Sequence, residues 1–152
     1  MKLIHRDKQS DFYTYTDITV QEGDIITKGR IAKPIEEIKT TLKDKVTSHR
    51  WQVETGGITL PNGARILTAI EDQNRINALM SNIRLSGLTE IDFKAANGWY
   101  KMTIPELEDM VKAIAIHLQQ CFTAEKLNHE AIDSLTTIEE LKSYDWTQHF
   151  PN

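Results

Sequence analysis

Cysteine is nearly absent from this sequence: Cys121 is the single one among 152 residues, so no disulfide can form within the chain. Long apolar stretches are absent too. No run of 18 apolar residues occurs, which argues against a membrane-spanning helix. The first twelve residues, MKLIHRDKQSDF, contain no hydrophobic segment typical of a secretory signal. We therefore expect synthesis in a reducing cytoplasm and no membrane partner.

An excess of positive charge is also missing. Lysine and arginine total 18 against 22 aspartate and glutamate residues, which gives a net charge of −4. A nucleic-acid-binding surface needs a basic surplus to neutralise phosphates, so nucleic acid is not an expected partner. Apolar residues make up 39% and charged residues 26% of the chain. These values indicate a soluble globular protein with one domain, or one domain plus a small appendage.

The sequence motifs of catalysis and metal binding are missing as well. The five histidines, at positions 5, 49, 117, 129 and 149, include no pair at the i,i+4 spacing of a zinc-binding helix. No serine occupies a G-x-S-x-G turn, and no complete glycine-rich phosphate loop is present. Cys121 falls on the apolar side of a long helix, which favours a core position over a nucleophile. We predict no catalytic, cofactor-binding or metal-binding residue, and therefore no enzyme activity.

The strongest positive feature is an amphipathic helix over residues 103–135. Its apolar residues recur every three or four positions, as expected for one side of an α-helix. They are Leu107, Val111, Ile114, Leu118, Cys121 and Phe122. Thr103 and Glu106 have the spacing of a capping box, which marks the first turn. His117 lies near this stripe, and we interpret it as a hydrogen-bonded core histidine.

Two short β-hairpins precede the long helix. Asn62-Gly63 and Asn97-Gly98 each separate two apolar runs, and both residue types enter left-handed backbone conformations at low cost. Between the hairpins we predict a helix that begins with a capping box of Thr68 and Glu71 and ends at Gly87.

Three features of the remaining sequence bear on packing. Trp99 and Tyr100 follow the second turn, and they suit either a core anchor or a sugar-stacking surface; we favour the core anchor. Thr137 and Glu140 predict a last, short helix with its own capping box. The aromatic residues of the C-terminal segment, residues 145–151, suggest that this end docks on the protein.

The N-terminal part of the chain has a sequence pattern typical of β-strands. Residues 1–32 predict a small antiparallel sheet, in which Phe12–Val20 is rich in aromatic and β-branched residues. Such a sheet is too small to be stable alone and needs a covering surface. That surface is another sheet, the body of this protein or another chain; in the last case the sheet is an attachment element for other proteins. The candidate interaction residues are Phe12, Tyr13, Tyr15 and Ile18.

A helix over residues 34–54 links this sheet to the rest of the chain. Its apolar residues form a narrow stripe, and Lys39, Lys43 and Arg50 are predicted to point toward solvent. Such a helix either packs on the core as one more element or pairs with a copy of itself in an oligomer.

These patterns together predict an α+β protein. A small N-terminal antiparallel β element is followed by a helix-rich domain with two short β-hairpins and one long central helix. The predicted domain organisation is a β attachment element at residues 1–33, a connecting helix at 34–57 and an α+β domain at 58–152.

Features in the last two thirds of the chain carry a family resemblance. In chain order, they are Ile58 with the Asn62-Gly63 hairpin, Asp72, Arg75 and Ile76 at a helix start, Trp99, then His117, Phe122 and Ala131-Ile132, and last Thr137–Leu141 with Tyr144, Asp145, Trp146 and Pro151. Residues 58–151 resemble a domain of unknown function common in tailed bacteriophages, usually the C-terminal part of small tail-associated proteins. The resemblance also implies a Gly-Trp pair where Gln148-His149-Phe150 stands.

The resemblance implies a place in phage assembly. It suggests a structural protein of a bacteriophage tail, baseplate or tail-fibre attachment region, located in the virion after synthesis in the host bacterial cytoplasm. The implied partners are other phage tail proteins, a tail fibre among them, and further copies of the chain in a homo-oligomer. The alternative is a tail-fibre assembly chaperone that is not retained in the virion. A third class of function is a small hydrolase or lysin component, and no motif in the sequence supports it.

Overall fold

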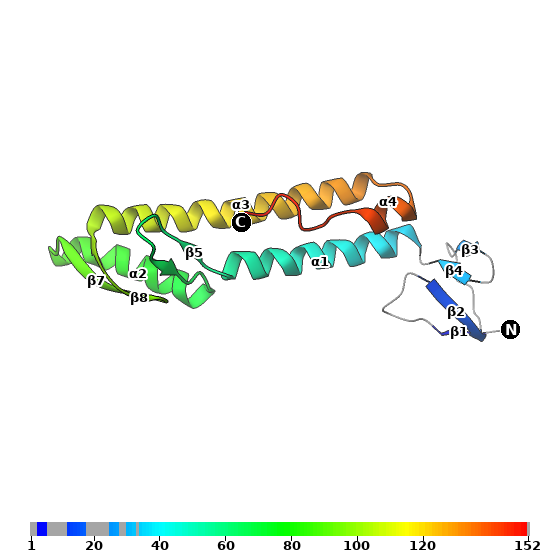
Figure 1. Ribbon diagram of the computed structural model, residues 1–152, viewed down its shortest axis with the longest axis horizontal. Coiled ribbons are helices and arrows are strands. Elements are labelled where there is room, and N and C mark those ends of the chain that lie inside the picture. The colour runs from blue at the N-terminus through cyan, green and yellow to red at the C-terminus, as the bar shows by residue number, and fades with distance from the viewer. Residues whose placement is uncertain (1–2, 6–11, 18–24, 28–29, 33, 152) are drawn as a thin grey trace. The chain divides into compact units, whose positions relative to one another are not determined.

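The computed structural model of the chain (Figure 1) describes residues 3–5, 12–17, 25–27, 30–32 and 34–151, with side chains from Pro34 onward. The chain divides into two compact units. One unit comprises residues 1–46 and 128–146, and the other comprises residues 47–127 and 147–152. Two helices, α1 (Ile35–Thr55) and α3 (Ile104–Ser134), contribute residues to both units.

The first unit contains the N-terminal sheet. Its strands are β1 (Leu3–His5), β2 (Phe12–Asp17), β3 (Ile25–Thr27) and β4 (Arg30–Ala32). All pairs are antiparallel and the order is β1-β2-β4-β3, so β2 has a neighbour on each side. The predicted small antiparallel sheet is confirmed for these ranges.

In the same unit, basic residues of α1 bind α3. Lys39 donates through Nζ to the Asp133 carbonyl oxygen at 2.8 Å, and Lys43 forms an ion pair with the Asp133 carboxylate. The Lys39 side chain is only 12% exposed. The prediction that Lys39 and Lys43 point toward solvent is therefore wrong, because α3 covers that side of α1 and its acidic end supplies their partners.

Helix α4 (Ile138–Ser143) begins as predicted. The Thr137 hydroxyl accepts from the Glu140 N–H while the Glu140 carboxylate accepts from the Thr137 N–H, which completes a capping box. After the helix, the Tyr144 hydroxyl donates to Oδ1 of the fully buried Asn128 at 2.7 Å. This bond satisfies a buried amide oxygen that would otherwise destabilise the unit.

The second unit begins with the end of α1 and the first predicted hairpin. Gly57 adopts φ 87°, and a Cβ there would lie 2.6 Å from the Ile66 carbonyl oxygen, so only glycine fits. Strands β5 (Ile58–Thr59) and β6 (Arg65–Ile66) pair across a turn in which Gly63 has φ 85°. This hairpin is confirmed.

Helix α2 (Ile70–Ser86) follows the hairpin and ends at Gly87, with φ 72°. The predicted capping box of Thr68 and Glu71 is wrong, since α2 begins one residue later and Ala69 precedes it without a side-chain cap. The Thr68 hydroxyl is buried. It donates to the Glu54 carbonyl oxygen at 2.5 Å and accepts from the Gly57 N–H at 2.9 Å, which joins α1 to the start of α2.

The second predicted hairpin pairs β7 (Glu90–Ala95) with β8 (Gly98–Thr103). Gly98 has φ 148°, whereas Asn97 has a negative φ and acts through its side chain. Its Oδ1 accepts from the Arg65 N–H at 2.8 Å, and its Nδ2 donates to the Gly63 carbonyl oxygen at 2.8 Å. The turn residue therefore ties the two hairpins together.

Helix α3 spans nearly the predicted range, and its capping box is present. The Thr103 N–H and hydroxyl both donate to Glu106 Oε2 at 2.8 Å. Most of the predicted stripe is confirmed, with Leu107, Ile114 and Cys121 buried. Phe122 departs from it and is 48% exposed, because the buried line continues through Ala124 instead.

The Thr103–Glu106 pair gives a pH-dependent prediction. Hydrogen bonds from the Thr103 N–H and then its hydroxyl lower the pKa of Glu106 below its ordinary 4.5. A carboxylate whose pKa is lowered by folding stabilises the fold at pH values above its ordinary pKa. This contribution is lost as the pH falls through the folded-state pKa. Thr103→Ala removes only the hydroxyl bond, so the Glu106 pKa should rise yet remain below 4.5 in an NMR titration. Glu140, whose pKa is lowered by Thr136 and Thr137, serves as an internal control and should not change.

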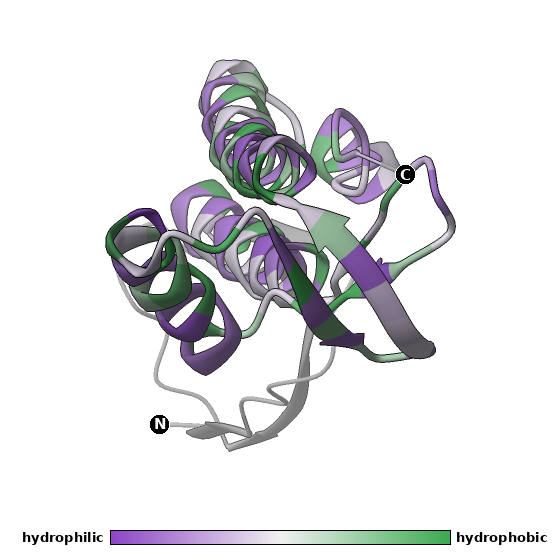
Figure 2. Ribbon diagram, turned by 90° about the vertical axis from the view of Figure 1, so that its left-hand side faces the viewer, coloured by the Kyte–Doolittle hydropathy of each residue, from purple (hydrophilic) through white to green (hydrophobic). Residues whose placement is uncertain are grey.

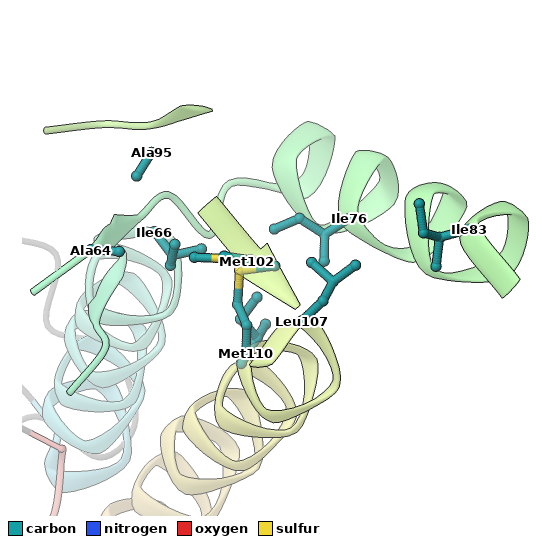
Figure 3. Close-up of a cluster of buried hydrophobic side chains, with 9 residues drawn as sticks. Ala64, Ile66, Ile76, Ile83, Ala95, Met102, Leu107 and Met110 are labelled. Atoms are coloured by element: carbon teal, nitrogen blue, oxygen red, sulfur yellow. The ribbon is translucent and has the colours of Figure 1, made fainter. Parts of the chain in front are cut away.

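The hydrophobic core of the second unit lies where α2, α3 and both hairpins meet. Figure 3 shows side chains from all of these elements converging around Met102. The buried members are Ala64, Ile66, Ile76, Ile83, Ala95, Met102, Leu107, Met110 and Ile114. Along β7, hydrophobic and hydrophilic residues alternate (Figure 2), so that Ile91, Phe93 and Ala95 face this core.

The C-terminal segment docks on the second unit. The Phe150 ring meets the His49 ring edge-on, with ring centroids 4.8 Å apart. His149 adopts φ 73°, a left-handed conformation that favours glycine. A glycine of the implied Gly-Trp pair would suit this position. The mostly helical α+β class is confirmed, with four helices and two two-stranded antiparallel hairpins in the described part of the chain.

Candidate protein-binding groove

A groove of about 770 Å³ opens beside β7 and α2 in the second unit, where Figure 1 shows the β7–β8 hairpin alongside α2. Its floor is apolar and comes from both elements. The lining residues are Arg65, Ile66, Leu67, Asp72, Arg75, Ile76, Leu79, Ile83, Leu88, Ile91, Asp92, Phe93, Lys94, Ala95 and Ala96. Ligand and peptide sites commonly combine such an apolar floor with a few charged groups at the rim.

Local sequence patterns build each wall of this groove. On α2, Ile76, Leu79 and Ile83 are spaced by three and four residues and share one side of the helix. On β7, alternate residues face the core, but residues from both of its faces line the groove. The groove therefore runs along the edge of β7 as well as beneath it.

Two leucines stand partly uncovered at this site. Leu67 is 49% exposed and Leu88 is 55% exposed, and both line the groove. Exposed leucines are unremarkable singly, but two beside one apolar hollow indicate a surface that gains from being covered. Sequence reasoning missed this site, although the apolar residues just after β6 and just before β7 carried the signal.

The charged residues at the rim are held by local bonds. Arg75 lies 3.7 Å from the Asp72 carboxylate and forms an i,i+3 ion pair with it on α2. Arg65 donates through Nη2 to the Gly56 carbonyl oxygen at 2.6 Å. Lys94 lies over the Trp99 ring, 5.7 Å from its centroid. These contacts fix positively and negatively charged side chains around the apolar floor of the groove.

Trp99 does not anchor the core. It is 70% exposed on the outer face of the hairpin, opposite Lys94, while Tyr100 and Met102 face inward. The favoured interpretation of Trp99 is therefore wrong. Strand alternation explains the outcome, since a buried Met102 places residues 100 and 102 on one face and residue 99 on the other.

Cys121 and His117 both lie at least partly inside the protein. Cys121 is fully buried, and burial raises the pKa of its thiol to about 11. The reactive thiolate is therefore scarce at neutral pH. His117 is partly buried, with Nε2 3.0 Å from the Val53 carbonyl oxygen. The core position of Cys121 is confirmed, and His117 is a hydrogen-bonded histidine at the edge of the core.

The predicted interaction residues lie elsewhere. Phe12, Tyr13 and Tyr15 belong to β2, and Ile18 lies outside the described residues, as do the side chains of the other three. Their role as an attachment surface stays a prediction.

Among the described residues, no three histidine, cysteine, aspartate or glutamate side chains gather in a way that could hold a metal ion. None of the helices described has the length and apolar character needed to cross a membrane.

Comparison with known families identifies the chain. A family model described as a domain of unknown function, DUF4376, matches residues 37–148, and the chain belongs to this family. The match extends over most of α1 as well as both hairpins, α2, α3 and α4. No curated protein and no solved structure matches the chain. The domain of unknown function in the predicted resemblance is thus supported, whereas its connection with phage tails stays a prediction.

Proposed function

We propose that this protein is a structural protein of a bacteriophage tail, baseplate or tail-fibre attachment region that acts by binding other proteins and is not an enzyme. The phage context rests on the sequence features from Ile58 to Pro151 that resemble tail-associated proteins. Protein binding rests on the groove between α2 and β7. Its apolar floor and partly exposed leucines favour a protein surface as ligand.

The mode of action follows from two separate surfaces. The N-terminal sheet serves as the attachment element to other tail proteins, a tail fibre among them. The groove on the second unit offers an additional contact for a neighbouring molecule. As part of the proposal, the protein is synthesised in the host cytoplasm and resides in the virion.

Mass spectrometry of purified particles tests the proposal. Particles of the phage that encodes this chain should contain it at a fixed copy number. If the chain is absent from particles but bound to a fibre in infected-cell lysate, the virion proposal fails and the assembly chaperone replaces it. Absence from both would contradict both functions.

Substitution in the groove provides a second test. Leu88→Glu places a charge on the apolar floor, which should reduce incorporation into particles at least about tenfold through the cost of covering an unpaired charge. Folding should be unaffected, because Leu88 is 55% exposed. Leu85→Glu is the matched control: Leu85 is 86% exposed and does not line the groove. Equal incorporation of both variants would exclude the groove as a binding surface.

The attachment role of the sheet has its own test. Tyr13→Ala should leave the melting temperature of the purified chain almost unchanged and reduce assembly into particles. Thr14→Ala, at the adjacent position of β2, is the comparison. A large fall in melting temperature with normal assembly would assign Tyr13 to the core instead.

A further inference from the structure

The backbone of β7 is bonded on one side only. In the described part of the chain, β7 and β8 form a two-stranded sheet with no third strand. The Ile104 N–H donates to the Thr89 carbonyl oxygen at 3.3 Å, in the same register that pairs Phe93 with Tyr100. Bonded pairs alternate in an antiparallel ladder, so the odd-numbered residues of β7 are those that bond to β8.

The even-numbered residues therefore direct their backbone groups to the free edge. Asp92 and Lys94 present N–H and C=O groups away from β8. Ala96 is the next even-numbered residue, and its backbone N–H also points away from β8. It donates to the Arg65 carbonyl oxygen at 2.9 Å, outside the β7–β8 hairpin. The edge at Asp92 and Lys94 lies along the groove. An exposed strand edge of this kind is a ready template for pairing with another strand.

The side chains on this edge form a self-complementary pattern. Asp92, Phe93 and Lys94 carry a negative charge, an aromatic ring and a positive charge in sequence. If two copies of β7 pair antiparallel about Phe93, Asp92 of each copy faces Lys94 of the other and the two Phe93 residues face each other. Opposite charges and aromatic pairs directly across strands are both stabilising.

Neighbouring registers lack this complementarity. A shift of the pairing centre by one residue places either Asp92 opposite Asp92 or Lys94 opposite Lys94. Like charges directly opposite each other are destabilising. The charge order thus selects one register, and in that register the outward backbone groups of Asp92 and Lys94 meet in bonded pairs.

We propose that the free edge of β7 pairs antiparallel with β7 of a second copy, centred on Phe93, so that two hairpins join into one four-stranded sheet. The pairing adds four backbone hydrogen bonds and two Asp92–Lys94 charge pairs. It also covers the apolar residues along the edge. This inference rests on the proposed protein-binding function and assigns the contact between copies to a particular surface.

Sedimentation of the purified full-length chain over a concentration series tests the pairing. The wild-type chain should dimerise. Asp92→Lys and Lys94→Asp each place like charges across the interface twice, so each should weaken the dimer at least about tenfold. Glu71→Lys, a control of the same charge change at an exposed position outside the groove, should leave dimerisation unchanged. Circular dichroism checks that each variant folds, as expected for exposed side chains.

Two rescue experiments separate pairing from a general charge effect. An equimolar mixture of the Asp92→Lys and Lys94→Asp chains should form a heterodimer, because each charge of one chain then faces its opposite on the other. The double variant Asp92→Lys/Lys94→Asp should recover the homodimer. A wild-type chain that stays monomeric, an oligomer that neither single variant weakens, or single variants that remain apart when mixed would each overturn the proposal. The measurement needs no phage, so its outcome is independent of whether particles contain the chain.

Discussion

Leu107→Ala should lower the free energy of unfolding by about 2–5 kcal/mol, the range for leucines removed from a packed core. Leu107 is 0% exposed and belongs to the buried cluster of the second unit (Figure 3). It lies in the first turns of α3, where that helix meets α2 and both hairpins. The truncation leaves a cavity that neighbouring residues cannot fill without moving several elements. Urea denaturation followed by circular dichroism gives the change in free energy.

An exposed leucine provides the control. Leu85 lies near the end of α2 and is 86% exposed, so Leu85→Ala should change stability by less than about 0.5 kcal/mol. Similar losses for the two variants would show that Leu107 is not in the core. A change in the slope of the denaturation curve would point to a different unfolded or native state.

Arg50→Ala should cost about 3 kcal/mol, the lower end of the range for breaking a buried ion pair. Arg50 donates through Nε to Glu125 Oε2 at 2.9 Å and forms an ion pair through Nη1 with Glu54. The Thr47 hydroxyl donates to the other Glu125 oxygen at 2.5 Å. Burial opposes the charge on Arg50, but the hydrogen bond to Glu54 and the negative charges of Glu125 and Glu54 outweigh it and raise the pKa of Arg50.

Loss of Arg50 is costly because of the charges it leaves behind. Its side chain is only 15% exposed, and the Glu54 residue is 6% exposed. Removing the cation leaves two shielded carboxylates near each other without their shared partner. Adding Glu54→Gln and Glu125→Gln to an Arg50→Met variant should recover part of the stability, since no unpaired charge then remains. No recovery would show that the cost comes from lost packing instead.

A surface ion pair offers a matched comparison. Arg84 donates to Glu108 Oε1 at 2.6 Å, shorter than the Arg50–Glu125 bond, but the Arg84 side chain is 66% exposed. Arg84→Ala should cost less than about 1 kcal/mol because water solvates both groups when the pair is broken. Chemical denaturation of Arg84→Ala and Arg50→Ala under the same conditions measures the difference between their losses of stability. We expect that difference to follow the burial of each pair and not its bond length.

Patterns between near neighbours in the sequence predicted most elements of the second unit. The capping boxes at Thr103 and Thr137 and the turn glycines Gly63 and Gly98 all lie where expected. Each depends on bonds or backbone angles within a few residues. Thr68 has the same capping spacing, yet its hydroxyl bonds to Glu54 and Gly57 instead. A competing partner distant in the sequence changed its role.

Positions on a helix surface were harder to predict. Lys39, Lys43 and Arg50 were expected in solvent because a narrow apolar stripe suggested one buried side of α1. In each unit the corresponding segment of α1 meets a segment of α3, whose Asp133 and Glu125 supply partners for these cations. A long basic side chain can be buried once its charge is paired. The local sequence contains no information about that partner.

The groove, too, could not be predicted from local sequence. Its walls come from β6, α2 and β7, and no single segment carries its shape. The sequence alone established the α+β class, the two hairpins and the long helix, since periodicity and turn chemistry are local properties. Packing between distant segments settled which polar residues are buried, that Trp99 faces outward, and that a strand edge and two leucines remain uncovered beside α2. Burial depends on which surfaces meet, and that depends on the whole chain at once.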